Sequence, residues 1–399
     1  MVTGEDIYTV PGFLASGIQT GIKVEAQKDL ALLFSTIPAS AAGVFTLNCF
    51  KAAPVLIDQE RIKSGVAQAI LINSGNANAA TGEEGYRDAI SMSRFVSDRL
   101  HIKEELVLVA STGIIGKKLP IGKIENGMNQ LFEGLSATGI TDAEDAIMTT
   151  DKFPKISFRK ALIDGKEVTV CGIAKGAGMI EPHMATMLAF IMSDVNIDSS
   201  ILDRIFRQTV NHTFNAVTVD GCMSTNDSAI ILANGLANNP RIKSYTKSLY
   251  LFKDMLYSVL AELSKAIVKD GEGATKIIEV LVDGAFSAAD AKKVAYAIAN
   301  SNLVKTAIFG CDPNWGRILS AAGSIPIPIP INEFTISIGD ILVFAHGMGC
   351  YGRERALAKI MTEDLVRIHV HLGMGDKAFV INTSDLSFDY IKINAHYHT

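Results

Sequence analysis

The stretch that decides the fold is Lys175-Gly176-Ala177-Gly178-Met179-Ile180-Glu181-Pro182-His183-Met184-Ala185-Thr186-Met187-Leu188-Ala189-Phe190. Its glycines and proline predict a turn. The apolar run that follows, Met187 to Met192, predicts a buried strand. Thr186 therefore stands where a turn ends and a strand begins. If the Ala185–Thr186 peptide bond were broken, Thr186 would gain an α-amine that can activate its own hydroxyl as a nucleophile. A threonine that opens a strand is also ordinary β-propensity, so this stretch alone leaves both interpretations open.

Two other segments pair a strand with a polar turn. The strand Ala67 to Ile72 runs into an amide-rich loop, residues 73–82, which indicates either Asx turns or a polar pocket wall. A second strand, Glu105 to Ala110, runs into Ser111-Thr112-Gly113-Ile114-Ile115-Gly116. A glycine N–H approaches a ligand closely and a threonine hydroxyl supplies a second donor, so this pair suits an oxyanion. Any junction between a strand and a turn can look the same.

Composition argues against several classes of function. The chain has 399 residues, 48% of them hydrophobic and 20% charged, which predicts two or three ordered domains. The net charge of −5 disfavours nucleic acid as a partner. The N-terminus lacks an apolar signal region and no apolar run is long enough for a membrane. Five cysteines without a CxxC pattern and eight histidines without a ligand pattern predict a cytoplasmic protein with reduced thiols and no metal site.

Strands and amphipathic helices alternate along the chain, which predicts an α/β fold. The apolar segments Leu30–Phe34 and Gly43–Phe45 predict two short strands, and Leu249–Val268 predicts a long helix. Strands precede and follow Thr186, the pattern of a sheet core with the nucleophile on a central strand. We place a domain boundary near residue 276, between a core of residues 1–275 and a smaller α+β domain of residues 276–399.

The segment Gly347-Met348-Gly349-Cys350-Tyr351-Gly352 offers a competing interpretation. It fits the pattern GxGxxG and stands between an expected strand and an expected helix, as in a dinucleotide-binding fold. Fewer than fifty residues follow it, too few for the rest of a doubly wound sheet. We therefore expect no nucleotide cofactor.

Several segments together resemble the bifunctional ornithine acetyltransferase/glutamate N-acetyltransferase (ArgJ) family. His183 stands where asparagine is commoner in that family. The matching segments are Asn73-Ser74-Gly75-Asn76-Ala77-Asn78, Ser111 to Gly116, Met148-Thr149-Thr150-Asp151, Met184-Ala185-Thr186-Met187-Leu188, Asp270-Gly271-Glu272-Gly273-Ala274-Thr275-Lys276, Asp312-Pro313-Asn314-Trp315-Gly316-Arg317 and the C-terminal tail.

The resemblance implies a layered α-β-β-α core of the N-terminal-nucleophile type. It implies self-cleavage between Ala185 and Thr186 into an alpha chain, residues 1–185, and a beta chain, residues 186–399. It assigns Thr186 as the nucleophile and Thr112 and Gly113 as the oxyanion hole. Substrate binding is assigned to Thr149, Lys175, Thr186, Glu272, Asn394 and Thr399.

The expected reaction is acetyl transfer from N2-acetyl-L-ornithine to L-glutamate through an acetyl-Thr186 intermediate, in the cyclic pathway of arginine biosynthesis. Acetyl-CoA is a second donor in some members of the family, and no other cofactor is expected. The family also implies a heterotetramer of two alpha and two beta chains. Two alternatives stay open: an aminopeptidase-like amidohydrolase with water as the acceptor, and a binding protein whose loop is never cleaved.

Overall fold

The computed structural model describes residues 8–23, 27–181 and 187–396 and divides into two compact units. Unit 1 takes in the described residues up to Asn215 together with Met223–Ile267. Unit 2 takes in Ala216–Cys222 and the described residues from Val268 onwards. The expected boundary near residue 276, between residues 1–275 and 276–399, stays a prediction.

Unit 1 is built on one sheet whose strands run in the order β4-β3-β2-β9-β7-β6-β5, with β1 paired to β2. Strands β3 and β4 are parallel, as are β7 and β9, whereas β6 and β7 are antiparallel. The strands are β1 (Phe13–Ile18), β2 (Leu30–Phe45), β3 (Val66–Asn76), β4 (Val107–Ile114), β5 (Ile156–Ile163), β6 (Lys166–Lys175), β7 (Leu188–Ser193) and β9 (Ser228–Ala233).

The prediction of two short strands, Leu30–Phe34 and Gly43–Phe45, was wrong because both belong to the 16-residue strand β2. The first half of β2 pairs with β1 and β3, and its second half pairs with β9. Between the halves the register to β3 shifts, and Pro38 lies in this irregular stretch. A proline is tolerated there because no ladder hydrogen bond needs its missing N–H. The single strand therefore joins the two halves of the sheet.

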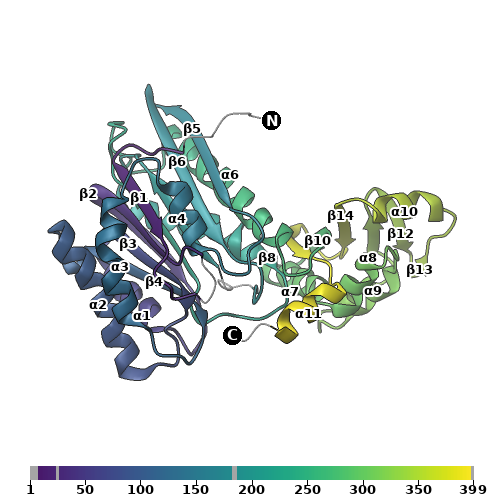
Figure 1. Cartoon of the computed structure of the whole chain (residues 1–399). Helices are drawn as coiled ribbons and strands as arrows, with labels where there is room; N and C mark the ends of the chain where they lie inside the picture. The colour runs from purple at the N-terminus through teal and green to yellow at the C-terminus, as the bar shows by residue number, and fades with distance from the viewer. Residues whose placement is uncertain (1–7, 24–26, 182–186, 397–399) are drawn as a thin grey trace. The chain divides into compact units, whose positions relative to one another are not determined.

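The helices of unit 1 complete a layered structure (Figure 1). Helices α1 to α3 cover one face of β2, β3 and β4 through a shared apolar cluster. The opposite faces of those strands and of β6, β7 and β9 enclose a second apolar cluster that includes α4. Val259 and Leu263 of α6 lie against Gly172 of β6. The helices are α1 (Ala53–Arg61), α2 (Gly82–Leu100), α3 (Ile121–Glu133), α4 (Ile140–Ile147), α5 (Ser199–Asn211) and α6 (Lys247–Lys269), with short 3-10 turns η1 (Ile62–Ser64), η2 (Glu104–Leu106) and η3 (Phe214–Ala216).

Unit 2 has its own sheet, in the order β13-β12-β11-β14-β10-β15-β8, and its own apolar core. Buried faces of β10 and β14 meet residues of α7, α8 and α9 in that core. Its strands are β8 (Val217–Thr218), β10 (Ile277–Ala285), β11 (Thr335–Ile338), β12 (Ile341–Ala345), β13 (Met348–Gly349), β14 (Leu365–His371) and β15 (Lys377–Ser384). Its helices are α7 (Ala288–Ala299), α8 (Asn302–Phe309), α9 (Trp315–Gly323), α10 (Glu354–Met361) and α11 (Phe388–His396). The expected fold class, mixed α/β with a helix–sheet–sheet–helix core and a smaller α+β part, is confirmed.

The GxGxxG segment forms a hairpin rather than a phosphate-binding turn. Strand β13, which contains Gly349, returns antiparallel along β12. Strand β11 lies between β12 and β14, so these two strands are not adjacent parallel neighbours. A dinucleotide fingerprint needs the glycine turn to open a helix between adjacent parallel strands, and this geometry differs from it. In the described part of the chain, no helix is both long and apolar enough to cross a membrane.

Candidate active site

Strand β7 begins two residues after Thr186, the predicted nucleophile, in the sequence. Ala185 and Thr186 are outside the described residues, so their roles stay predictions. Met187, the next residue, is buried; its N–H donates to Asp227 Oδ1 at 3.0 Å and its carbonyl accepts from Ser228 N at 3.2 Å. Strand β7 runs between β6 and β9. The expected buried, central strand directly after Thr186 is confirmed.

The proposed oxyanion donors, Thr112 and Gly113, lie at the end of strand β4. Thr112 is buried and pairs with Ser74 of β3. Gly113 has φ +130°, and a Cβ at this position would lie 2.5 Å from the carbonyl carbon of Gly75 and 2.6 Å from the nitrogen of Asn76. Only glycine fits this conformation and this space. The structure thus explains why a glycine stands here, while its role in catalysis stays a prediction.

Lys175 ends strand β6 and lies beside Thr112. Its backbone pairs with Leu188 of β7, and its side chain is buried. The ammonium Nζ lies 3.4 Å from Thr112 Oγ1. Two residues that the sequence analysis assigned from separate segments are therefore brought together in unit 1. A buried cation beside the hydroxyl also makes this position electrostatically favourable for a developing negative charge.

A buried carboxylate, Asp151, organises the loops around Lys175. Its Oδ1 accepts hydrogen bonds from Gly176 N and Lys155 Nζ, each at 2.7 Å, and its Oδ2 accepts one from Thr149 N at 2.8 Å. Burial alone would raise the pKa of Asp151. The ammonium groups of Lys175 and Lys155 and the Gly176 N–H outweigh burial and lower this pKa to about 2. The carboxylate thus stays charged and fixes the backbone on both sides of the site.

A further cation, the half-buried Lys23, contacts the same region. Its Nζ donates to the carbonyl oxygens of Lys28 and Met148, both at 2.7 Å. Burial lowers the pKa of Lys23 to about 8, against the attraction of Asp29. Because Met148 precedes Thr149, this contact fixes the start of the segment that the resemblance assigned to substrate binding.

Asn226 and Asp227, in the loop before β9, received no role from the sequence. Asn226 Nδ2 donates to the carbonyls of Ala77 and Ser111, at 2.6 and 2.8 Å. Asp227 is fully buried, and burial raises the pKa of its carboxyl well above the usual range, opposed by the Met187 N–H and Lys175. Its Oδ2 has no hydrogen-bond partner among the described residues. The sequence signal that points to Asp227 is an acidic residue directly before a strand, β9, that is apolar after its first residue, Ser228.

Two more assigned residues meet inside unit 2. Asn394 of α11 donates through Nδ2 to Glu272 Oε2 at 2.8 Å, although the residues are 122 positions apart. Glu272 is buried and precedes Gly273, whose φ is +71°. Thr399 lies outside the described residues, so its role stays a prediction. The pairing gives Asn394 a means to orient the Glu272 carboxylate.

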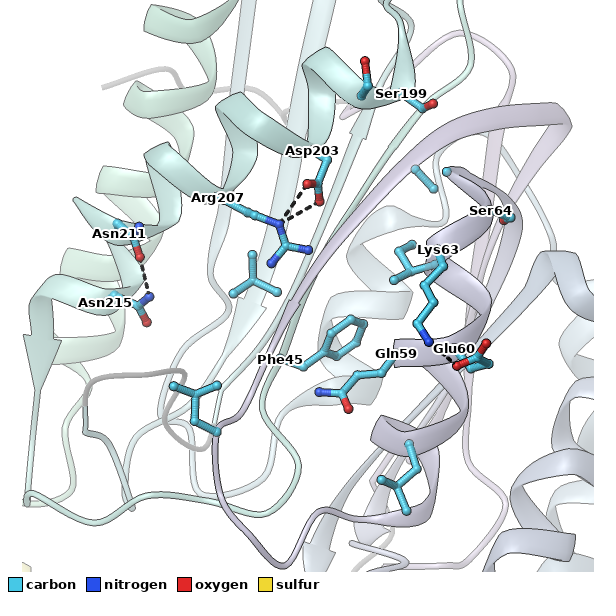
Figure 2. Close-up of a pocket in the computed structure, with 17 residues that line it drawn as sticks. Phe45, Gln59, Glu60, Lys63, Ser64, Ser199, Asp203, Arg207, Asn211 and Asn215 are labelled. Carbon is cyan, nitrogen blue, oxygen red and sulfur yellow. Dashed lines mark hydrogen bonds and ion pairs between the residues drawn. The ribbon is translucent and has the colours of Figure 1, made fainter.

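A large cavity in unit 1, of about 850 Å³, lies elsewhere, between η1 and α5 (Figure 2). Arg207 pairs with Asp203 at 2.9 Å and Lys63 with Glu60 at 2.5 Å, so the charges of this cavity satisfy one another. None of the predicted site residues lines it. Within the described ranges, no group of three histidine, cysteine or acidic side chains is placed to hold a metal.

Comparison with known proteins identifies the family. The family model described as "ArgJ family" matches residues 14–399. The arginine biosynthesis bifunctional protein ArgJ of Geobacter sulfurreducens is 47% identical over 98% of this chain and 100% of its own length. The protein of the same name from Caldanaerobacter subterraneus subsp. tengcongensis is 48% identical over 97% of each chain. The crystal structure of ArgJ from Bacillus halodurans aligns with a TM-score of 0.50 and 39% identity, over 52% of this chain and 98% of that chain. The chain belongs to the ArgJ family.

Proposed function

We propose that this protein is an acetyltransferase of arginine biosynthesis that moves the acetyl group of N2-acetyl-L-ornithine to L-glutamate. The observation that carries the proposal is the grouping of the buried residues Thr112 and Lys175 with the half-buried Gly113 at the ends of β4 and β6, in a chain of the ArgJ family. This group offers a hydroxyl, a closely approachable N–H and a cation beside the strand that follows Thr186.

The first step of the proposal is maturation. The Thr186 hydroxyl attacks the Ala185 carbonyl, and the peptide bond becomes an ester. This shift of the acyl group from nitrogen to oxygen breaks the C–N bond and frees the α-amine of Thr186. Water then hydrolyses the ester, which releases the carboxylate of Ala185 and the hydroxyl of Thr186. The products stay associated because β6, on one side of the break, and β7, on the other, are paired in the same sheet.

The second step is turnover in two half-reactions. The α-amine of Thr186, whose reference pKa is about 7.7–8.0, takes the hydroxyl proton as the oxygen attacks the acetyl carbonyl. Thr112 and Gly113 donate to the oxyanion, and ornithine leaves with the proton held by the α-amine. The amine of glutamate then attacks acetyl-Thr186 and N-acetylglutamate leaves. A covalent intermediate of this kind predicts ping-pong kinetics.

Substrate binding is proposed for Thr149, Lys175, Glu272, Asn394 and Thr399. Glu272 offers a carboxylate that complements the side-chain ammonium of ornithine. Its contact with Asn394 keeps that carboxylate in one orientation. Lys175 offers a cation suited to a substrate carboxylate or to the oxyanion.

The name "bifunctional", which the relatives carry, supports a second proposed reaction from acetyl-CoA and glutamate to N-acetylglutamate. We also propose an assembly of two alpha and two beta chains and a cytoplasmic location. The thiols of Cys49, Cys222 and Cys311 are exposed and are not joined in disulfide bonds, which fits a reducing compartment.

The experiment that tests this proposal measures the intact mass of the denatured protein beside a Thr186→Ala variant. Two chains that break before Thr186, against one chain in the variant, would support self-cleavage. The cleaved protein is then incubated with N-acetylornithine, with and without glutamate. N-acetylglutamate formed only with glutamate supports the transferase, whereas acetate released without glutamate would favour a hydrolase.

A further inference from the structure

We propose that Asn226 and Asp227 are positioning residues for acetyl transfer, because they tie the start of strand β7 to the end of strand β4. The inference rests on the proposed function, since it concerns how the nucleophile strand and the oxyanion strand are held together. Neither residue belongs to the oxyanion pair or to the substrate-binding set.

Asn226 links two segments that carry predicted site residues. Its Nδ2 group donates one hydrogen bond to the carbonyl of Ser111, which precedes Thr112, and one to the carbonyl of Ala77. Its Oδ1 accepts from the Thr225 hydroxyl at 2.6 Å. The side chain is buried, so losing these bonds would leave carbonyl groups unpaired away from water. Asn226 therefore fixes the backbone directly before the oxyanion donors.

Asp227, the next residue, holds the strand on the other side. Its Oδ1 accepts from the backbone N–H of Met187, and its own carbonyl accepts from Thr46 N of the segment after β2. The Met187 nitrogen forms the peptide bond with Thr186, so this hydrogen bond fixes the atom that leads into the proposed nucleophile. The side chain of Asn226 thus binds the segments at the ends of β3 and β4, and the side chain of Asp227 binds the residue directly before β7.

The consequence is a fixed separation between β7 and β4, which are not neighbours in the sheet. Strands β3, β2 and β9 lie between them in the hydrogen-bonded order. Twist and bending of these three strands could change the distance between the ends of β7 and β4. The Asn226–Asp227 link joins those ends directly. A displacement of about 1 Å between reacting groups can cost about 100-fold in rate.

A purely structural role for Asn226 can be separated from a positioning role by a matched residue. Asn239 is buried in unit 1 and lies beyond the opposite end of the paired strands β7 and β9. Its Nδ2 donates to the carbonyls of Asn196 and Pro240, and its Oδ1 accepts from Asn196 N. Asn226 and Asn239 therefore each make two donated hydrogen bonds and one accepted bond.

The experiment compares Asn226→Leu with Asn239→Leu in the cleaved enzyme. Leucine has a similar size, donates nothing and brings no charge. We expect both variants to lower the midpoint of thermal unfolding, but only Asn226→Leu to lower kcat, by about 100-fold with little change in the KM values. Equal kcat values in the two variants would overturn the role of Asn226. The pair Asn226→Ser and Asn239→Ser repeats the comparison with smaller side chains if a leucine variant does not fold.

For Asp227 the informative variant is Asp227→Asn, beside Asp227→Ala. The amide oxygen of asparagine can still accept from Met187 N, so Asp227→Asn should keep kcat within about tenfold of the parent, while Asp227→Ala should lose about 100-fold. Equal losses in both would overturn the hydrogen-bond role. A parent protein that is not cleaved or does not transfer acetyl refutes the proposed function; an active parent with these negative results refutes only the positioning role.

Discussion

A single added methyl group at Gly113 should inactivate the enzyme without unfolding it. A Cβ there would lie 2.5 Å from backbone Gly75, and ordinary contact begins near 3.4 Å, so the end of β4 must retreat by about 0.9 Å. The atoms that it meets belong to the backbone of β3, which is hydrogen-bonded in the sheet and cannot rotate away. The Gly113 N–H would move with the strand. Loss of one oxyanion donor costs about 100- to 1000-fold in kcat, which is our expectation for Gly113→Ala.

The control for this variant is Gly116→Ala. Gly116 also has a positive φ, +79°, but a Cβ there meets nothing within 4 Å. Both substitutions place alanine in the left-handed region, at about 1–3 kcal/mol of strain, and only Gly113→Ala displaces a neighbouring strand. Steady-state acetyl transfer and urea unfolding should be measured for both. Similar kcat values for the two variants would refute the reasoning, because backbone strain alone would then account for the loss.

Three further predictions follow from the site. Thr112→Val removes the hydroxyl near Lys175 and should lower kcat about 100- to 1000-fold, whereas Thr112→Ser keeps a hydroxyl and should keep most of the parent kcat. Equal kcat values for Thr112→Val and the parent would show that Thr112 is not part of the oxyanion hole. Glu272→Gln keeps an oxygen for Asn394 but loses the charge, so the KM for acetylornithine should rise about 10- to 100-fold; an unchanged KM would argue against contact with ornithine. Asp151→Asn should lower the free energy of unfolding by about 3–5 kcal/mol at pH 7, because the buried ammonium of Lys155 loses its counter-charge. The pKa of Asp151 is about 2 in the folded protein, below its ordinary value of 3.8. The stabilisation from this carboxylate is therefore present above pH 3.8 and lost as the pH falls through about 2. The stability difference between parent and Asp151→Asn should therefore shrink between pH 4 and 2, and a constant difference would contradict the assigned pKa.

Much of the fold could be predicted from local patterns, and strand β2 shows where local patterns fail. The helix α6 and strands β3, β4 and β7 follow apolar runs or three- and four-residue spacing, which depend on neighbouring residues only. In β2 the run is interrupted by the exposed residues Thr36, Ile37 and Pro38, which resemble a turn. The strand continues because its two halves pair with different partners, β3 and β9. Those partners are distant in sequence, so no local pattern reports them.

The residues of the candidate site also fall into two groups: those that local sequence could predict and those that depend on long-range contacts. Thr112, Gly113 and Lys175 belong to segments whose residue types already suit the chemistry, so motif and resemblance select them. Asp151 and Asn226 stand in polar loops that would ordinarily be solvated, and nothing local distinguishes them from turn residues. Their burial arises from long-range packing, which brings Gly176 to Asp151 and Ser111 to Asn226. Burying such groups costs free energy unless every partner is in place. A buried polar loop residue that is hydrogen-bonded to two chain segments therefore marks segments whose separation the fold fixes. Its contacts in the structure reveal this role, and its neighbours in the sequence do not.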